Sequence, residues 1–273
     1  MKIYRVNEQI IYPENHGFFS FIYRKPHLLD QVKADYKRDG IALKIFFKPL
    51  ESDLESYLYG NYFVDASQKS KSSLLLESVK VQNICAFEGL APKVFGVDLI
   101  EYEGHQFPML VVEDVGLIPE WDIRNIVEIW GKLSTLSKKY GFEMGYFDSN
   151  VGNAMSGKWL DFQGFSLGDN YVENLKERLT KSATWSGNHY QSVPKLGLDG
   201  FRKTDIRIKE LGLDRINFEG AQVLDIGCSG GEFSMYALEH GASYVLGADF
   251  PSVIAGTREI ANYLGCFNID WHG

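Results

Sequence analysis

The segment Val223–Gly231, with the sequence VLDIGCSGG, joins a short apolar run to a turn rich in glycine. A short apolar run that ends at such a turn is typical of a buried strand, and Phe233–Glu239 then has the pattern of a helix. A second strand (Tyr244–Gly247), a second helix (Ser252–Leu264) and a third strand (Phe267–Asp270) follow. This alternation predicts parallel strands joined by right-handed helical crossovers.

Two acidic residues lie at the predicted carboxyl ends of these strands. Asp225 precedes the first glycine of the turn by two residues, and Asp249 follows the second strand. A dinucleotide would place its pyrophosphate at this turn, where the carboxylate of Asp225 would repel it. S-adenosylmethionine (SAM) instead carries a sulfonium and an ammonium, which a carboxylate attracts. The residues therefore favour SAM, and a nicotinamide site or a domain of this fold without a ligand remains an alternative.

The same stretch resembles the class I SAM-dependent methyltransferases. The resemblance implies that Asp225, Gly227, Ser229 and Gly231 hold the methionine part of SAM and that Asp249 binds the ribose. The family commonly has glycine where this chain has Ser229, and a small side chain still fits there. The family's sheet has further strands beyond the three predicted here. The first strand is therefore expected to be an exposed apolar edge, and the sequence to be part of a longer domain.

A second group of polar residues occurs earlier in the chain, in an order that suits nucleotide chemistry. Lys44 lies in the strand-like run Ile41–Phe46, and a helix is expected near residues 70–89. The group consists of Lys44, Glu77, Asp148, Asn153 and Asp161. A lysine held by a glutamate can position phosphates, and an aspartate with an asparagine can hold Mg²⁺.

Residues 10–168 resemble the small atypical kinases, such as the aminoglycoside and lipopolysaccharide kinases. The resemblance implies that Lys44 and Glu77 bind ATP, that Asn153 and Asp161 bind Mg²⁺, and that Asp148 is the catalytic base. There are departures from the family. The loop expected over the phosphates has one glycine, Tyr-Phe precedes Asp148 where kinases have a histidine, and few residues follow Asp161 before the next domain. A degenerate kinase scaffold used for binding is the alternative.

Composition limits the remaining classes of function. The chain has 273 residues, 45% of them hydrophobic, and a formal charge of −8, which disfavours general binding to nucleic acid. Its three cysteines fit neither a disulfide framework nor a zinc site, and no apolar run is long enough for a membrane span. A cytoplasmic protein is expected, with the oligomeric state open. Apart from the helix near residues 70–89, residues 1–115 are expected to form strands and turns, with Lys33, Lys37 and Arg38 on a hairpin.

The predicted fold is an α+β kinase-like domain over residues 1–170, a connecting segment over 171–212, and a partial α/β Rossmann-like domain with parallel strands over 213–273. The expected function is SAM-dependent methyl transfer to a glycan or a small molecule, with an attached kinase-like module. One alternative is a Mg-ATP-dependent phosphotransferase whose methyltransferase half is vestigial. A non-catalytic binding protein is the second alternative.

Overall fold

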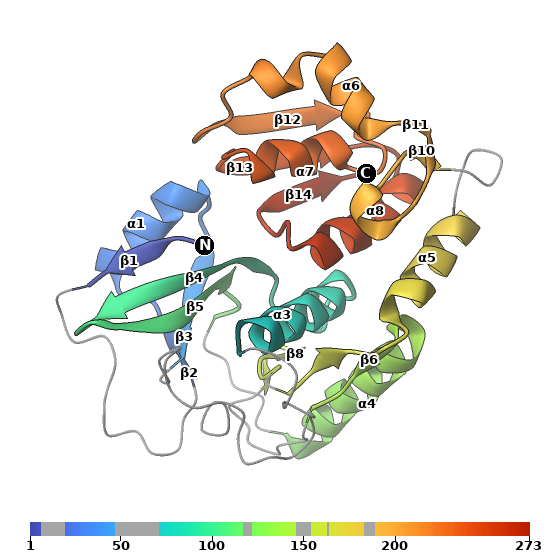
Figure 1. Cartoon of the computed structure of the whole chain (residues 1–273). Helices are drawn as coiled ribbons and strands as arrows, with labels where there is room; N and C mark the ends of the chain where they lie inside the picture. Colours follow the sequence, from blue (N-terminus) through green and yellow to red (C-terminus); the bar gives the residue numbers. More distant parts are fainter. Residues whose placement is uncertain (7–19, 47–70, 117–121, 146–153, 163, 183–188) are drawn as a thin grey trace. The chain divides into compact units, whose positions relative to one another are not determined.

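The computed structural model describes residues 1–6, 20–46, 71–116, 122–145, 154–162, 164–182 and 189–273 (Figure 1). The chain forms two compact units. The first comprises Met1–Ala34 and Arg38–Gly168, and the second comprises Asp35–Lys37 and Asp169–Gly273. Each unit contains its own sheet, and parallel pairing occurs in both. Among the described helices, none combines the length and apolarity that crossing a bilayer requires.

The sheet of the first unit has five strands in the order β1-β4-β5-β3-β2. β1 pairs with β4 in parallel, and the other neighbours are antiparallel. The strands are β1 (Ile3–Arg5), β2 (Ser20–Tyr23), β3 (Ile41–Phe46), β4 (Val94–Tyr102) and β5 (His105–Glu113). All six residues of β3 are buried, so this strand is covered on both sides, although the alternation in its sequence resembles that of a half-buried strand.

Helix α3 (Lys71–Phe87) confirms the helix predicted near residues 70–89, and a second long helix, α4 (Ile123–Tyr140), follows β5. Asp122 caps the first turn of α4 by accepting a hydrogen bond from the Arg124 N–H at 2.9 Å, and Gly141, with φ 79°, ends the helix. α3 contacts β4, β9 and α4 (Figure 1). The short strands are β6 (Phe142–Glu143), β7 (Ala154–Met155), β8 (Lys158–Trp159) and β9 (Ser166–Leu167).

The expectation of strands and turns before residue 40 is wrong, because Pro26–Tyr36 forms helix α1. Proline is favoured at the first position of a helix, where its missing N–H has no intrahelical partner to lose. Leu28, Leu29 and Val32 then share a buried face. Lys33 therefore lies on a helix and not on a hairpin.

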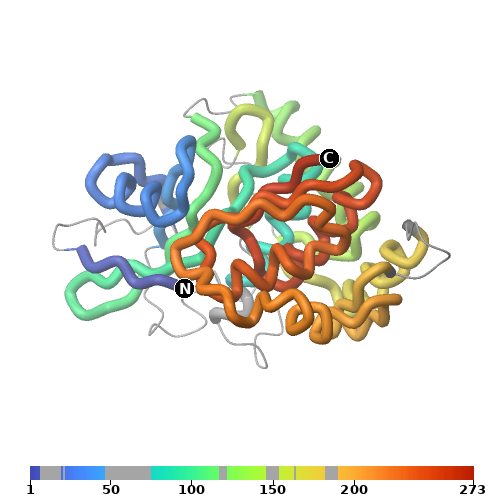
Figure 2. The backbone as a smooth tube through the Cα atoms, turned by 90° about the horizontal axis from the view of Figure 1, so that it is seen from above, coloured from blue at the N-terminus to red at the C-terminus, as the bar shows by residue number. Residues whose placement is uncertain are grey.

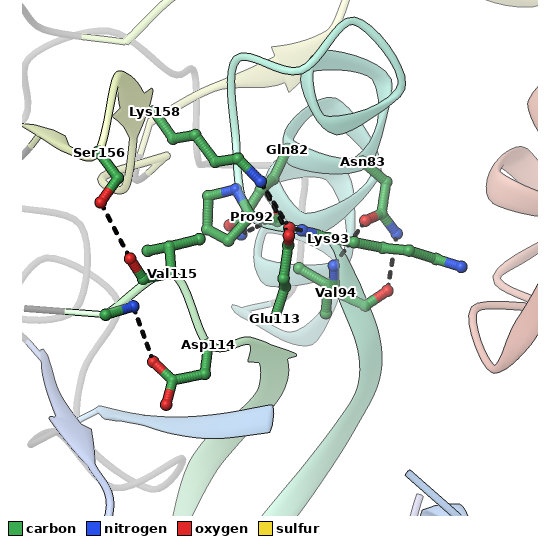
Figure 3. A network of polar contacts seen from close by, with 11 residues as sticks. Gln82, Asn83, Pro92, Lys93, Val94, Glu113, Asp114, Val115, Ser156 and Lys158 are labelled. Atoms are coloured by element: carbon green, nitrogen blue, oxygen red, sulfur yellow. Dashed lines mark hydrogen bonds and ion pairs between the residues drawn. The ribbon is translucent and has the colours of Figure 1, made fainter. Parts of the chain in front are cut away.

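Side-chain amides attach α3 to the start of β4 (Figure 3). Asn83 uses both ends of its amide: Nδ2 donates to the Val94 carbonyl at 3.1 Å, and Oδ1 accepts from the Val94 N–H at 2.7 Å. Gln82 Nε2 donates to the Pro92 carbonyl at 2.9 Å. Both side chains are buried, so these bonds satisfy groups that would otherwise be costly to remove from water.

The second unit carries a three-stranded parallel sheet, in the order β12-β13-β14, built by the segment whose sequence predicts it. Its elements are β12 (Gln222–Ile226), α7 (Glu232–Glu239), β13 (Tyr244–Ala248), α8 (Pro251–Leu264) and β14 (Ile269–His272). Gly265, with φ 80°, ends α8 as predicted, and β14 begins two residues later than expected. α7 contacts all three strands, and α8 contacts β14 (Figure 1).

Further elements precede this sheet within the same unit. They are α5 (Tyr171–Ser182), β10 (His189–Gln191), the 3₁₀ turn Pro194–Leu196, β11 (Gly200–Arg202), α6 (Thr204–Glu210) and the 3₁₀ turn Leu213–Arg215. α5 contacts α8, and Arg178 forms an ion pair with Glu259 at 2.7 Å. Figure 2 shows the trace of residues 169–182 and 189–273 in yellow to red.

β12 lies at the edge of the described sheet, with β13 as its hydrogen-bonded neighbour there. Leu224 is 60% exposed and Ile226 is 79% exposed. The exposed apolar first strand that the sequence predicts is thus present among the described residues.

Candidate functional site

The two predicted acidic residues meet at the carboxyl edge of the parallel sheet. Asp225 pairs in register with Gly247 near the end of β13, and Asp249 follows that strand directly. The two carboxylates are close enough for the charge of Asp249 to raise the pKa of Asp225. Burial is the larger cause of this raised pKa, and hydrogen bonds from the hydroxyl and N–H of Ser234 oppose it. A compact negative site results.

The glycine turn is hydrogen-bonded to the end of β13. The N–H groups of Gly227 and Cys228 both donate to the Ala248 carbonyl, at 2.8 and 3.2 Å. Gly227 has φ 75°, and a Cβ placed on it would meet no atom within 4 Å. The backbone at Gly227 is therefore open to the approach of a ligand, beside the two carboxylates.

Gly231 has a different reason to be glycine. Its φ is 78°, and a Cβ there would lie 2.6 Å from the ring of Trp271 and 2.7 Å from the methyl carbon of Thr257. Trp271 also contacts the position of a Cβ on Gly247, at 2.4 Å. The indole ring of Trp271 thus packs against backbone at two glycines and supports the end of the turn.

Ser229 is the non-glycine residue of the turn with a positive φ, 50°. Its N–H donates to Asp249 Oδ2 at 2.7 Å, and its carbonyl accepts from Thr257 Oγ1 at 2.6 Å. Asp249 Oδ1 accepts from the Phe250 N–H at 2.7 Å. A carboxylate has about four acceptor positions, so Asp249 retains acceptor capacity for a ligand.

Two buried titratable groups flank the turn. Burial raises the pKa of the Cys228 thiol to about 12, with Asp225 and Asp249 adding to the effect. Burial also raises the pKa of Glu232, the first residue of α7, to about 8, and Glu239 contributes while Lys195 opposes. Glu232 Oε1 is buried without a hydrogen-bond partner. Cys228 is thus an unreactive thiol at neutral pH, whereas Glu232 is held largely in its neutral form.

The earlier group of predicted residues lies partly in the first unit. Lys44, on β3, is 8% exposed and donates from Nζ to the Leu160 carbonyl at 2.9 Å, next to Asp161. Burial lowers the pKa of Lys44, and the charge of Asp161 opposes this effect. Glu77 lies on α3 near Lys80; burial lowers the pKa of Lys80, and the charge of Glu77 opposes this effect.

The structure therefore brings Lys44 and Asp161 together. Asp148 and Asn153 lie outside the residues that the structure describes. The Trp159 indole N–H donates a hydrogen bond to the Asp161 carbonyl, which fixes the backbone of Asp161.

Some polar groups at the end of β5 and in the segment that follows it are hydrogen-bonded within this chain (Figure 3). The Val115 carbonyl accepts from Ser156 Oγ at 3.0 Å, and the Gly116 N–H donates to Asp114 Oδ1 at 3.0 Å. Glu113 forms an ion pair with Lys158 at 2.8 Å.

Sequence reasoning missed Thr257, Trp271 and Glu232. Their contacts depend on how α8, β14 and α7 pack, and no local motif marks them. The nearest signal is the polar Thr257 at helical spacing from the apolar Ile254 and Ile260.

Comparison with known proteins gives one partial similarity. A 65-residue part of the chain is 38% identical to protein arginine N-methyltransferase 1 of Saccharomyces cerevisiae. This part makes up 24% of this chain and 17% of that protein. The chain thus covers about a sixth of the length of this relative. No family profile matches the chain. The similarity supports a methyltransferase, and the mixed α/β structure with its parallel sheet is compatible with a Rossmann-like fold.

Proposed function

We propose that the second unit binds SAM at the carboxyl edge of its parallel sheet and belongs to a methyltransferase. The observation that carries this proposal is the convergence of Asp225 and Asp249 beside the open backbone of Gly227. Two carboxylates at a glycine turn suit a cationic ligand and oppose a pyrophosphate. The partial similarity to a methyltransferase points to the same cofactor.

The residues of this edge have distinct proposed roles. Asp249 would accept hydrogen bonds from the ribose hydroxyls, and Asp225 would attract the ammonium of the methionine part. Gly227 would let the ligand lie against the backbone, and Ser229 and Gly231 would complete the turn that holds the methionine part. Asp225 is partly buried, so an ionic interaction there is screened less than one at the surface.

Bound SAM supplies a methyl group on a positively charged sulfur that a nucleophile can attack. This chain would contribute by holding the cofactor in one orientation, which lowers the entropic cost of an in-line attack. A glycan or a small molecule remains our proposed acceptor. The name of the yeast relative adds a protein arginine to the candidates.

Calorimetric titration of the purified chain with S-adenosylhomocysteine (SAH) tests the proposal. We expect binding by the wild type and a loss of about 100-fold in affinity for Asp249→Asn, because two neutral groups replace a charged acceptor pair. Asp214→Asn is the control, since it removes an exposed carboxylate of the same unit. The absence of SAH binding by the wild type, or equal binding by Asp249→Asn, would contradict the proposal.

Phosphotransfer from Mg-ATP by the first unit is a second candidate function. Lys44 favours it, because a buried ammonium beside Asp161 suits a phosphate site with a metal ion. In this proposal Glu77, Asp148, Asn153 and Asp161 keep the roles that the kinase resemblance implies. It is the second candidate because the partial similarity is to a methyltransferase.

Titration with Mg-ATP tests this second candidate. Lys44→Met should abolish binding, and Lys132→Met should leave it unchanged, because Lys132 forms an exposed pair with Glu128 on α4. If the wild type binds Mg-ATP but not SAH, the phosphotransferase alternative replaces the methyltransferase proposal. If it binds neither ligand, a non-catalytic binding protein becomes the better interpretation.

A further inference from the structure

The hydroxyl of Thr257 is joined to the acidic end of the sheet through Ser229. Thr257 lies on the buried face of α8 and is 2% exposed. Its Oγ1 is 2.6 Å from the Ser229 carbonyl and 3.1 Å from the Val253 carbonyl one turn earlier in the helix. A hydroxyl has one hydrogen, so the shorter contact indicates that Thr257 donates to Ser229.

Ser229 is held on both of its peptide groups. Its carbonyl accepts from Thr257, and its N–H donates to Asp249 Oδ2 at 2.7 Å. With φ 50°, Ser229 adopts a left-handed backbone conformation that is unfavourable for most residues other than glycine. External contacts must therefore offset the preference of Ser229 for another conformation.

The methyl group of Thr257 reaches the other end of the turn. Its carbon lies 2.7 Å from the position of a Cβ on Gly231. One side chain thus contacts the turn at Ser229 and at Gly231.

We propose that Thr257 is a positioning residue for the SAM site, through a chain of hydrogen bonds that runs from Thr257 to Ser229 to Asp249. Thr257 itself touches no ligand in this arrangement. It holds Ser229 so that the Ser229 N–H fixes the carboxylate of Asp249 toward the ribose position. This inference rests on the proposed function of the second unit.

The test compares Thr257→Val with Thr257→Ser by SAH titration. Valine keeps the shape of threonine and removes the donor, so the Ser229 carbonyl loses its partner. We expect affinity to fall about tenfold for Thr257→Val and to stay within about threefold of the wild type for Thr257→Ser, which retains the hydroxyl.

Thr204→Val is the matched control. Thr204 is 6% exposed, lies in the same unit, and donates to the Ser192 carbonyl at 2.6 Å, the same distance as in the Thr257 bond. This variant should lose comparable stability and keep wild-type affinity for SAH. An equal loss of affinity in Thr204→Val and Thr257→Val would overturn the inference, because a general loss of stability would then explain both.

Amide hydrogen exchange of the ligand-free chain gives a second measurement. Thr257→Val should speed exchange at the Ser229 N–H about tenfold, and Thr204→Val should not. Unchanged exchange at Ser229 in Thr257→Val overturns the inference even if SAH does not bind to any variant. Wild-type chain that fails to bind SAH overturns the proposed function, and the exchange at Ser229 then decides the role of Thr257 separately.

Discussion

The two units offer sites of opposite charge. In the first unit a buried ammonium, Lys44, lies beside one carboxylate, Asp161. In the second unit two carboxylates, Asp225 and Asp249, converge at a glycine turn. Burial disfavours the charged form in both sites: it lowers the pKa of Lys44 and raises the pKa of Asp225. A ligand of the opposite charge would relieve that penalty, so the two proposed ligands differ in charge: an anion, Mg-ATP, for the first unit and a cation, SAM, for the second.

Adding a side chain at a tightly packed glycine of the second unit should produce the largest difference in stability between the two units. Gly247→Ala places a Cβ 2.4 Å from the Trp271 ring, and we expect it to lower the free energy of unfolding of the second unit by about 3 kcal/mol. Hydrogen exchange read peptide by peptide measures this effect in each unit. Equal destabilisation of residues 1–168 would show that the two units do not unfold separately.

The pH dependence of ligand binding should have opposite directions in the two units. Acidification protonates Asp225, whose pKa is raised, so SAH affinity should fall as pH falls. Alkali deprotonates Lys44, whose pKa is lowered, so Mg-ATP affinity should fall as pH rises. Titrations at acidic, neutral and alkaline pH measure the two trends. In Asp225→Asn the affinity for SAH should be about tenfold lower, and it should no longer fall as the pH falls. If the affinities of both units changed in the same direction with pH, the comparison would be refuted.

Glu232 should make the free energy of unfolding of the second unit depend on pH. Its pKa is about 8 in the folded chain against 4.5 for a free carboxyl, so its contribution is complete below about pH 4.5 and is lost as pH rises through about 8. Glu232→Gln should therefore raise the free energy of unfolding by several kcal/mol at pH 9 and have little effect at pH 4.

Urea unfolding at both pH values measures the effect of Glu232→Gln. Glu239→Gln serves as a control, because removing that neighbouring charge should lower the pKa of Glu232 and weaken the pH dependence without abolishing it. A gain for Glu232→Gln that is equal at both pH values would mean that Glu232 is already ionised at acidic pH.

The smallest expected effect lies in the first unit. Gly131 is exposed within α4, and a Cβ on it would meet no atom within 4 Å. Gly131→Ala should raise the free energy of unfolding by about 0.5–1 kcal/mol, because alanine loses less backbone entropy in a helix. Chemical denaturation measures it. A loss of stability would indicate that this face of α4 is covered.

The sheet of the second unit could be predicted from sequence to within about two residues, because its signals are local. The apolar run of β12, the glycine turn and Gly265 each act on neighbouring residues. α1 was missed because the pattern of Leu28, Leu29 and Val32 is short and its proline resembles a turn signal. Element type follows from spacing only where the periodic stretch is long.

In the candidate site, too, only residues with local sequence signals could be predicted. Asp225 and Asp249 were found because each ends a predictable strand, and adjacent parallel strands end at one edge. Thr257 and Trp271 lie 26 to 40 positions away in the sequence from the turn residues that they contact, and they reach the turn through tertiary packing. Lys44 was found as a strand residue, but its pairing with the Leu160 carbonyl depends on a contact across 116 residues.

The packing of Trp271 against Gly231 and Gly247 has an optical consequence. An indole ring in contact with the backbone of a turn changes its fluorescence when that turn moves or when a charged ligand arrives beside it. The difference between the emission spectra of the wild type and of Trp271→Phe therefore isolates a signal from the turn itself. The chain carries its own reporter at the position where the proposed cofactor would bind.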